Sequence, residues 1–286
     1  STRALSSAAS DVYKRQAVAS LQTAARTAGN YLRQCGNEVV SHENEDEATA
    51  EILYNILCRK EGNAQPWTQK VKQVLADYIA AGRDLDTIPV NEFYAPSQID
   101  FTHGGYICVD GLYYAYLLVP STGYKTQVPA GWLSLLVNAG DGIDMDLFLT
   151  RQPKDRMVRK LGQQLRINRS KIRETSDTNT DFDDLDGAIR SGYFLKDGLG
   201  NNEDFYYLNL LVTVTAENVE DLEWKVAELK KLMLSQDMDV QTCSFCQEQA
   251  FLSSMPLVSL ERHLYERSKR NVPVSYTHLT LPTIRL

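Results

Sequence analysis

The stretch FYYLNLLVTVT at residues 205–215 is a near-continuous run of β-forming residues. Such a run is expected for a central strand that is covered on both faces. A helix is predicted to begin near Ala216, with Thr215 as its N-cap, and a short strand follows at residues 238–242. The apolar positions of that helix recur every three or four residues: Val219, Leu222, Val226, Leu229 and Met233. The stretch therefore predicts a β-α-β unit.

A second β-α-β unit is predicted upstream. Residues 106–109 and 112–119 are strand-like and flank Asp110-Gly111, a dipeptide favoured by tight primed hairpin turns. A short helix is predicted at residues 130–139, followed by an alternating strand at residues 143–149. Two such units interleaved predict an α+β fold, with a ferredoxin-like split β-α-β sheet that is preceded by a helical segment.

A helical hairpin at residues 154–198 is predicted between the two units. Its first helix, about residues 154–175, is basic, and its second helix ends near Phe194. The two are joined by a turn rich in aspartate: Asp177, Asp181, Asp183, Asp184 and Asp186. Gly198 and Gly200 are expected to be turn residues before the strand.

The basic helix supplies the candidate interaction surface, which consists of Arg156, Arg159, Lys160, Arg166 and Arg169. These side chains would contact phosphates or an acidic partner. Alternatively, they form a solvated face that is neutralised by the acidic turn. The solvated face is the favoured interpretation, because the chain has a net charge of −7 and no aromatic residues interleave with the basic ones for base stacking.

The N-terminal part, residues 17–82, is predicted to be a helical segment, with helices at residues 17–35, 48–60 and 67–81. Gly82 is placed to end the last of them. Residues 83–104 connect this segment to the strands, and residues 83–272 are expected to form the α+β domain. No apolar run approaches the roughly 20 residues of a membrane-spanning helix.

No catalytic, cofactor-binding or metal-ligating residue is predicted. The sequence contains no G-x-x-x-x-G-K-[ST] phosphate loop, no H-E-x-x-H and no G-x-S-x-G. Cys243 and Cys246 form a lone C-x-x-C, whereas a structural zinc site needs two more ligands at similar spacing. The favoured interpretation is two small buried residues, and a redox pair is the alternative.

The two ends of the chain match a translated sequencing adapter. SSAASDVYKRQ at residues 6–16 reads the adapter forwards, and VSYTHLTLPT at residues 274–283 reads its reverse complement. Residues 1–16 and 273–286 are therefore expected to be adapter-derived and not native, with few buried contacts. The native sequence is expected to continue beyond both ends of residues 17–272.

The second half of the chain resembles a known family. The segments that carry the resemblance are LGQQLRINRSKIRETSDTNTDFDDLDGAIRSGYFLKDGL (161–199), EDFYYLNLLVTVTAENVEDLEWKVAELKKLMLSQDMDVQ (203–241), QAFLSSMPL (249–257) and LYERSKRNV (264–272). They resemble the N-terminal region of the conjugation ATPases of type IV secretion, of the VirB/TrbE/TraE type, from integrative conjugative elements of Gram-positive bacteria. The resemblance covers about residues 85–272. In that family, a motor domain with the nucleotide-binding loop follows.

The resemblance implies a cytoplasmic, oligomeric parent ATPase that uses ATP and Mg at the inner face of the cell membrane. This chain would be its non-catalytic docking and assembly domain, without a cofactor of its own. Its partners would be components of the secretion channel and other copies of itself, with only weak DNA contact. The alternative is an independent ferredoxin-like module that binds single-stranded nucleic acid through the basic helix. A phosphate loop downstream of Val272 would favour the first.

Overall fold

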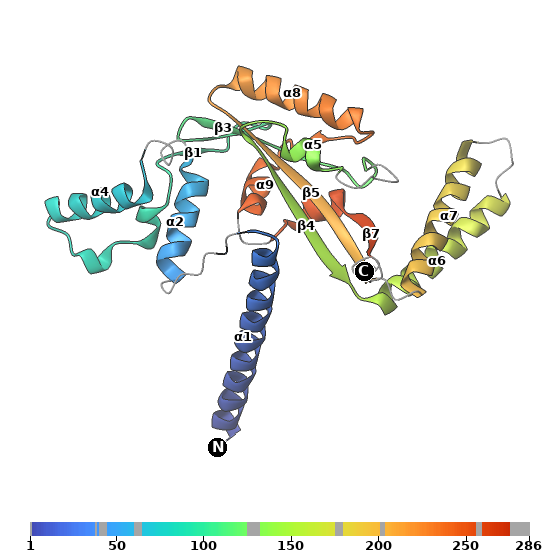
Figure 1. Cartoon of the computed structure of the whole chain (residues 1–286), viewed down its shortest axis with the longest axis horizontal. Coiled ribbons are helices and arrows are strands. Elements are labelled where there is room, and N and C mark those ends of the chain that lie inside the picture. The colour runs from blue at the N-terminus through green and yellow to red at the C-terminus, as the bar shows by residue number, and fades with distance from the viewer. Residues whose placement is uncertain are drawn as a thin grey trace, which may run out of the picture. The chain divides into compact units, whose positions relative to one another are not determined.

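A computed structural model describes residues 2–37, 39, 45–59, 65–124, 132–174, 180–200, 204–255 and 259–274 (Figure 1). The chain divides into two units, Ser1–Leu53 and Tyr54–Leu286. Among the helices that fall in the described ranges, none is both long enough and apolar enough to cross a membrane.

The first unit contains helix α1 (Thr2–Gln34) and most of α2 (Glu45–Leu57). The predicted helix at residues 17–35 is confirmed, but α1 begins well before it. Because α1 is continuous across residues 16 and 17, no break in the backbone marks the expected adapter junction. From Lys14 to Gln34, only Gly29 is buried, so α1 has almost no core of its own.

Helix α4 (Trp67–Ala80) confirms the third predicted helix, and Gly82 ends it as expected. Gly82 has a φ of 63°, and its N–H bonds the carbonyl of Ile79, while the N–H of Arg83 bonds that of Tyr78. This pattern is a Schellman motif, which favours glycine at the left-handed position. The connector that follows forms two short 3₁₀ helices, η1 (Leu85–Thr87) and η2 (Val90–Phe93).

The sheet lies in the second unit, and all of its neighbouring strands are antiparallel. The main strand order is β1-β2-β3-β5-β4, while β6 also pairs with β3 and β7 pairs with β5. The strands are β1 (Ile99–Asp100), β2 (Ile107–Val109), β3 (Leu112–Leu118), β4 (Ile143–Gln152), β5 (Asp204–Ala216), β6 (Gln241–Thr242) and β7 (Arg270–Val274). The prediction of a central strand at residues 205–215 is confirmed by β5.

The predicted hairpin between β2 and β3 is confirmed. Asp110 and Gly111 have φ values of 48° and 78°, the left-handed pair that a type I′ turn requires. The carboxylate of Asp110 also accepts hydrogen bonds from the backbone N–H groups of Ser97 (3.0 Å) and Gln98 (2.8 Å). The turn residue therefore holds the connector against the hairpin.

The α+β class is confirmed. The order β6-β3-β5-β4 contains the strands of both predicted β-α-β units. Helix α8 (Val219–Ser235) is the connection in the β-α-β unit that begins with β5. In the β-α-β unit that begins with β3, helix α5 (Ser134–Val137) is shorter than the helix predicted at residues 130–139. Residues 125–131 lie outside the described residues. The ferredoxin-like designation therefore stays a prediction.

Apolar side chains pack on both faces of β5, as expected for a central strand, and Figure 1 shows α8 and α9 on opposite sides of it. On one face, Leu222, Leu229 and Met233 of α8 pack against a cluster that includes Val212 and Val214. The other face packs against α9 (Gln247–Ser254) and α10 (Arg262–Ser268). The second cluster includes Tyr116, Leu118, Leu211, Phe251 and Leu264.

The predicted N-cap of α8 was wrong. The cap is Asn218, whose side chain accepts a 2.8 Å hydrogen bond from the backbone N–H of Asp221. Thr215 is still within β5, and its hydroxyl donates to the carbonyl of Gly142 at 3.1 Å. The strand therefore extends past the position at which β-propensity alone was expected to end it.

The inserted hairpin consists of α6 (Lys154–Glu174) and α7 (Thr180–Gly200). The basic helix is confirmed, but the acidic turn is wrong for Asp181, Asp183, Asp184 and Asp186, which belong to α7. Negative charge in the first turns of a helix complements its dipole. Asp177 lies outside the described residues.

Helix α7 also continues further than predicted, through Gly198 and Gly200. Leu199 is buried in a cluster with Met157, Leu161, Phe205 and Tyr207. This tertiary packing outweighs the low helix propensity of glycine.

Strand β7 crosses the boundary expected at residue 273. Pro273 pairs in register with Phe205, and Val274 pairs with Asp204. Two residues that are expected to be adapter-derived thus extend a strand. Tyr13 and Tyr276 were expected to stay out of the core. The structure describes only the backbone of Tyr13, and Tyr276 lies outside the described residues.

Candidate functional site

The five basic residues of the candidate surface all lie on α6, and all five are exposed. The opposite side of α6 is buried through Met157, Leu161 and Leu165. Helix α7 approaches closely at Gly192, where an added Cβ would lie 2.8 Å from a methyl group of Leu165. The buried side chains of Met157, Leu161 and Leu165 thus fix which side of α6 faces outward.

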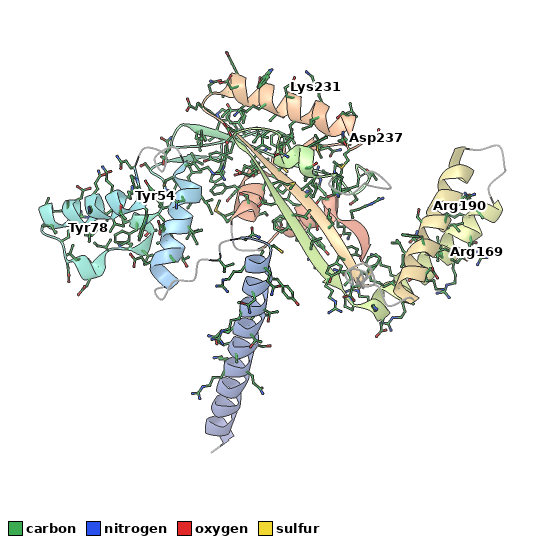
Figure 2. All side chains as sticks on the ribbon, viewed as in Figure 1. Tyr54, Tyr78, Arg169, Arg190, Lys231 and Asp237 are labelled. Carbon is green, nitrogen blue, oxygen red and sulfur yellow. The ribbon has the colours of Figure 1, made fainter. Side chains whose placement is uncertain are left out.

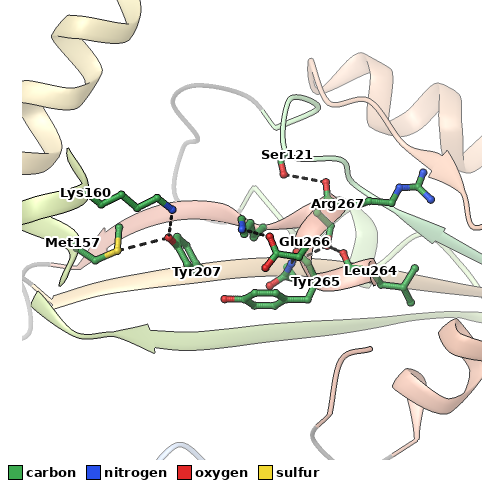
Figure 3. A network of polar contacts seen from close by, with 11 residues as sticks. Ser121, Met157, Lys160, Tyr207, Leu264, Tyr265, Glu266 and Arg267 are labelled. Atoms are coloured by element: carbon green, nitrogen blue, oxygen red, sulfur yellow. Dashed lines mark hydrogen bonds and ion pairs between the residues drawn. The ribbon is translucent and has the colours of Figure 1, made fainter. Parts of the chain in front are cut away.

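Lys160 differs from the other four basic residues, because it contacts the sheet. Its Nζ donates a 3.1 Å hydrogen bond to the hydroxyl of Tyr207 and lies 5.6 Å from the centre of that ring (Figure 3). The Tyr207 hydroxyl in turn donates to Met157 Sδ at 3.6 Å. Lys160 therefore joins the base of the hairpin to β5.

The same polar network continues into α10. Asn209 of β5 donates to the carbonyl of Tyr265 at 3.0 Å and to the hydroxyl of Ser268 at 2.8 Å (Figure 3). Lys269 lies 5.6 Å from the ring centre of Tyr207 and 5.8 Å from that of Tyr265. The base of the hairpin is thereby tied to two other elements of the second unit.

A groove of about 540 Å³ lies along the exposed side of α6. Three cationic side chains line it, Arg159 and Arg166 from α6 and Lys196 from α7, together with Val158, Gly162 and Gln163. No carboxylate belongs to this described lining. The groove is therefore suited to an anionic group.

One aromatic side chain of α7, that of Tyr193, lies close to a basic residue of α6. The guanidinium of Arg169 lies over the ring of Tyr193, 5.9 Å from its centre, and Figure 2 shows Arg169 and Arg190 on the hairpin. Phe194 is 70% exposed. The sequence analysis missed the aromatic neighbour of Arg169, because Tyr193 comes from the second helix and not from the basic one.

The acidic turn was expected to neutralise the basic residues of α6, but Asp186 pairs with a residue of its own helix. Its carboxylate pairs at 2.6 Å with Arg190 on the same helix. Cation and anion are four residues apart, a spacing at which helical side chains meet. This aspartate therefore pairs within α7 and stabilises that helix.

A pocket that the sequence analysis did not single out lies on the sheet face that α9 covers, with a volume of about 480 Å³. Its floor includes a row across three strands, in which Tyr116 of β3 and Asp144 of β4 are both register partners of Thr213 on β5. Ile56 and Arg59 border one side, and residues of α9 such as Ser253 border another.

Charges are unevenly compensated in this pocket. Arg59 forms an ion pair with Asp144. Asp146, two residues along β4, has its pKa raised to about 6, first by burial and then by the negative charge of Asp144. Burial likewise raises the pKa of Tyr114 to about 12 and raises the pKa of Tyr116. The tyrosines are therefore neutral at physiological pH.

Thr213 adds an uncompensated polar group to the pocket floor. The residue is 4% exposed, and its Oγ1 has no hydrogen-bond partner within the described part of the chain. Buried hydroxyls nearly always have a partner. Thr213 therefore marks a point where a further polar group would be accommodated.

Cys243 and Cys246 are both buried free thiols. Burial raises the pKa of Cys243, which keeps the thiol protonated and weakly nucleophilic. Within the ranges given above, no group of three or more His, Cys, Asp or Glu side chains is arranged to hold a metal ion. The two cysteines belong to the core beside Tyr116.

Comparisons with known proteins do not identify a family for this chain. No model of a protein family matches the sequence, and no curated protein matches it.

Proposed function

We propose that the chain is the non-catalytic docking and assembly domain of a conjugal transfer ATPase of type IV secretion. The resemblance of residues 85–272 to that family is one support. In this proposal the parent protein binds ATP and Mg through a motor domain outside this chain. It acts in the cytoplasm, peripheral to the inner face of the cell membrane.

The observation that carries the docking role is the outer surface of the α6–α7 hairpin. Its base is fixed by a buried cluster and by the Lys160–Tyr207 hydrogen bond. Its exposed surface includes Arg159 and Arg166, which line the groove, and Tyr193, whose ring lies beside the guanidinium of Arg169. Arginine and aromatic residues are enriched where proteins bind one another. The expected partners are channel components and other copies of the protein.

The second candidate function is binding of single-stranded nucleic acid. The cation groove would contact phosphates, and Tyr193 beside Arg169 would offer a surface for base stacking. The net charge of −7 opposes this function, because long-range repulsion lowers the affinity for a polyanion. We therefore rank it second.

Equilibrium binding and turnover of ATP test the assignment to an ATPase. Residues 17–272 and the recovered full-length protein are compared side by side. The fragment is expected to be inactive, because phosphoryl transfer requires a phosphate loop, a lysine and a magnesium-binding hydroxyl. Micromolar ATP binding by the fragment would overturn the docking-domain role. A full-length protein without a phosphate loop would overturn the ATPase assignment.

Charge reversal on the hairpin separates docking from nucleic-acid binding. Arg159→Glu with Arg166→Glu is compared with a control on α8, Lys230→Glu with Lys231→Glu. Self-association is followed by sedimentation, binding to purified channel components by calorimetry, and binding of a single-stranded oligonucleotide by fluorescence anisotropy. If the hairpin variant alone loses protein binding, docking is supported. If it alone loses a salt-sensitive DNA interaction, the second function is favoured.

A further inference from the structure

We propose that the pocket between α9 and the sheet binds a small organic cation that carries a primary ammonium group. This pocket shares no lining residue with the hairpin groove, so the inference does not rest on the proposed docking function. The argument starts from the sheet register, which determines which side chains share the pocket floor.

The register places the polar groups of the floor on one face of the sheet. Asp144 and Tyr116 are both direct partners of Thr213, and partners in antiparallel strands present their side chains to the same face. Asp146 is two residues from Asp144 on the same strand, so its side chain also points to this face. All four residues line the pocket.

The balance of charge in the floor favours a cationic ligand. The described lining holds two carboxylates, Asp144 and Asp146, and one cation, Arg59, which is paired with Asp144. When both carboxylates are ionised, the group carries one uncompensated negative charge. The raised pKa of Asp146 reflects the cost of that charge in a partly buried site. A ligand cation would remove this cost.

Thr213 gives the second, independent indication of a ligand. Its buried Oγ1 has no partner in the described structure, and leaving such a group unsatisfied destabilises a protein. An ammonium group offers three N–H donors and no acceptor. Donation of one N–H to Asp146 would leave two more for other acceptors, of which Thr213 is the candidate.

The walls of the pocket suit an alkyl chain. Ile56, Phe148, Phe251 and Met255 border the polar floor, and apolar walls with a few polar groups are typical of small-molecule sites. A divalent metal ion suits the site less well, because the carboxylate of Asp144 is already paired with the guanidinium of Arg59. An anion is disfavoured by the two carboxylates.

Calorimetric titration of the full chain with n-butylamine tests the proposal, with 1-butanol as a probe of similar shape that lacks the charge. At pH 7.5 and low salt, butylamine is expected to bind at least about tenfold more tightly than butanol, since hydrogen bonds between charged groups are stronger than those between neutral groups. No measurable binding of butylamine, or equal binding of both probes, would overturn the proposal.

Substitutions locate the binding. Asp146→Asn and Thr213→Val should each weaken butylamine binding, whereas Glu223→Gln on the exposed side of α8 should not. Circular dichroism verifies that each variant is folded. If both pocket variants bind as tightly as the unmodified chain, the ammonium group is held elsewhere and the proposal fails.

The pH profile is a further readout, because it does not depend on any variant. Arg59, Asp144, Tyr114 and Tyr116 are the charged or titratable groups around Asp146. The pKa of Asp146 itself is raised to about 6. Butylamine binding should therefore weaken as the pH falls below about 6. An affinity that stays constant from pH 7.5 to 5 would contradict the proposed contact.

Discussion

Lys160 Nζ donates a 3.1 Å hydrogen bond to the hydroxyl of Tyr207, which joins the basic helix α6 to the central strand β5. Tyr207 is itself buried in the cluster at the base of the hairpin. Of the five basic residues of the candidate surface, Lys160 therefore helps to hold α6 against the sheet. Arg159 and Arg166 differ, because they line an open groove.

Removing this hydrogen bond should destabilise the second unit. Tyr207→Phe keeps the ring but deletes the hydroxyl that bonds Lys160 and Met157. The expected loss is about 1 kcal/mol in the free energy of unfolding, measured with urea. Tyr193→Phe on the exposed surface of α7 is the control and should change little. Equal effects of the two substitutions would argue against a structural role for the pair.

The packing of α8 on the sheet can be tested by truncation. Leu222→Ala or Leu229→Ala should cost roughly 2–5 kcal/mol, since both side chains are fully buried. Leu234→Ala lies on the same helix but is 69% exposed, so its effect should be small. Chemical denaturation gives all three values. A larger loss for Leu234 than for Leu222 would contradict the orientation of the helix.

The N-terminal cap of α8 gives a third prediction. Asn218→Ala deletes the acceptor for the N–H of Asp221 and should lower stability by about 1 kcal/mol. Asn218→Ser retains an oxygen acceptor and should restore most of that loss. Thermal unfolding of the two variants is the measurement. If serine is no better than alanine, the cap makes no measurable contribution.

Asp146 should make stability depend on pH. Its pKa is raised to about 6 in the folded chain from an ordinary value of 3.8, so the folded state binds its proton more tightly. Relative to Asp146→Asn, the unmodified chain should therefore lose stability as the pH rises from about 4 to 7. The expected change is on the order of 1 kcal/mol, reduced from the full shift by solvent screening.

Urea unfolding at pH 4.5 and 7, carried out on both proteins, measures this change. Glu223→Gln serves as the control for the loss of an exposed carboxylate. A stability difference between the unmodified chain and Asp146→Asn that is identical at the two pH values would contradict the raised pKa.

Local sequence patterns were sufficient for much of the fold. The β-forming run at residues 205–215 and the apolar spacing of Leu222 and Leu229 identified β5 and α8, because both signals arise within single elements. The Asp110-Gly111 turn and the Gly82 helix end were likewise local, since each depends on a left-handed backbone position. Long-range packing caused the error at Gly198 and Gly200, where burial of Leu199 extends the helix.

The sites were much less predictable than the fold. The alternating sequence around Asp144 and Asp146 indicated a half-buried strand but did not reveal a pocket. The pocket depends on the register of β4 with β5 and on Arg59, which is 85 positions from Asp144. Similarly, Tyr193 contacts Arg169 only because the two helices fold back on each other. Such contacts arise from tertiary structure, which a single sequence does not specify locally.

The position of the α6–α7 hairpin has a consequence for the order in which the chain assembles. Gln152 at the end of β4 is the register partner of Phe205 near the start of β5, so the hairpin is in effect a long loop between two adjacent strands. Closing a flexible loop costs entropy that grows with its length, while local helices form within about a microsecond. An early helical hairpin would bring the ends of β4 and β5 together before β3 joins them. Replacing residues 153–204 with a two-residue Asn-Gly turn should then leave the rate of β4–β5 pairing nearly unchanged, whereas a flexible linker of the same length as the hairpin should slow it.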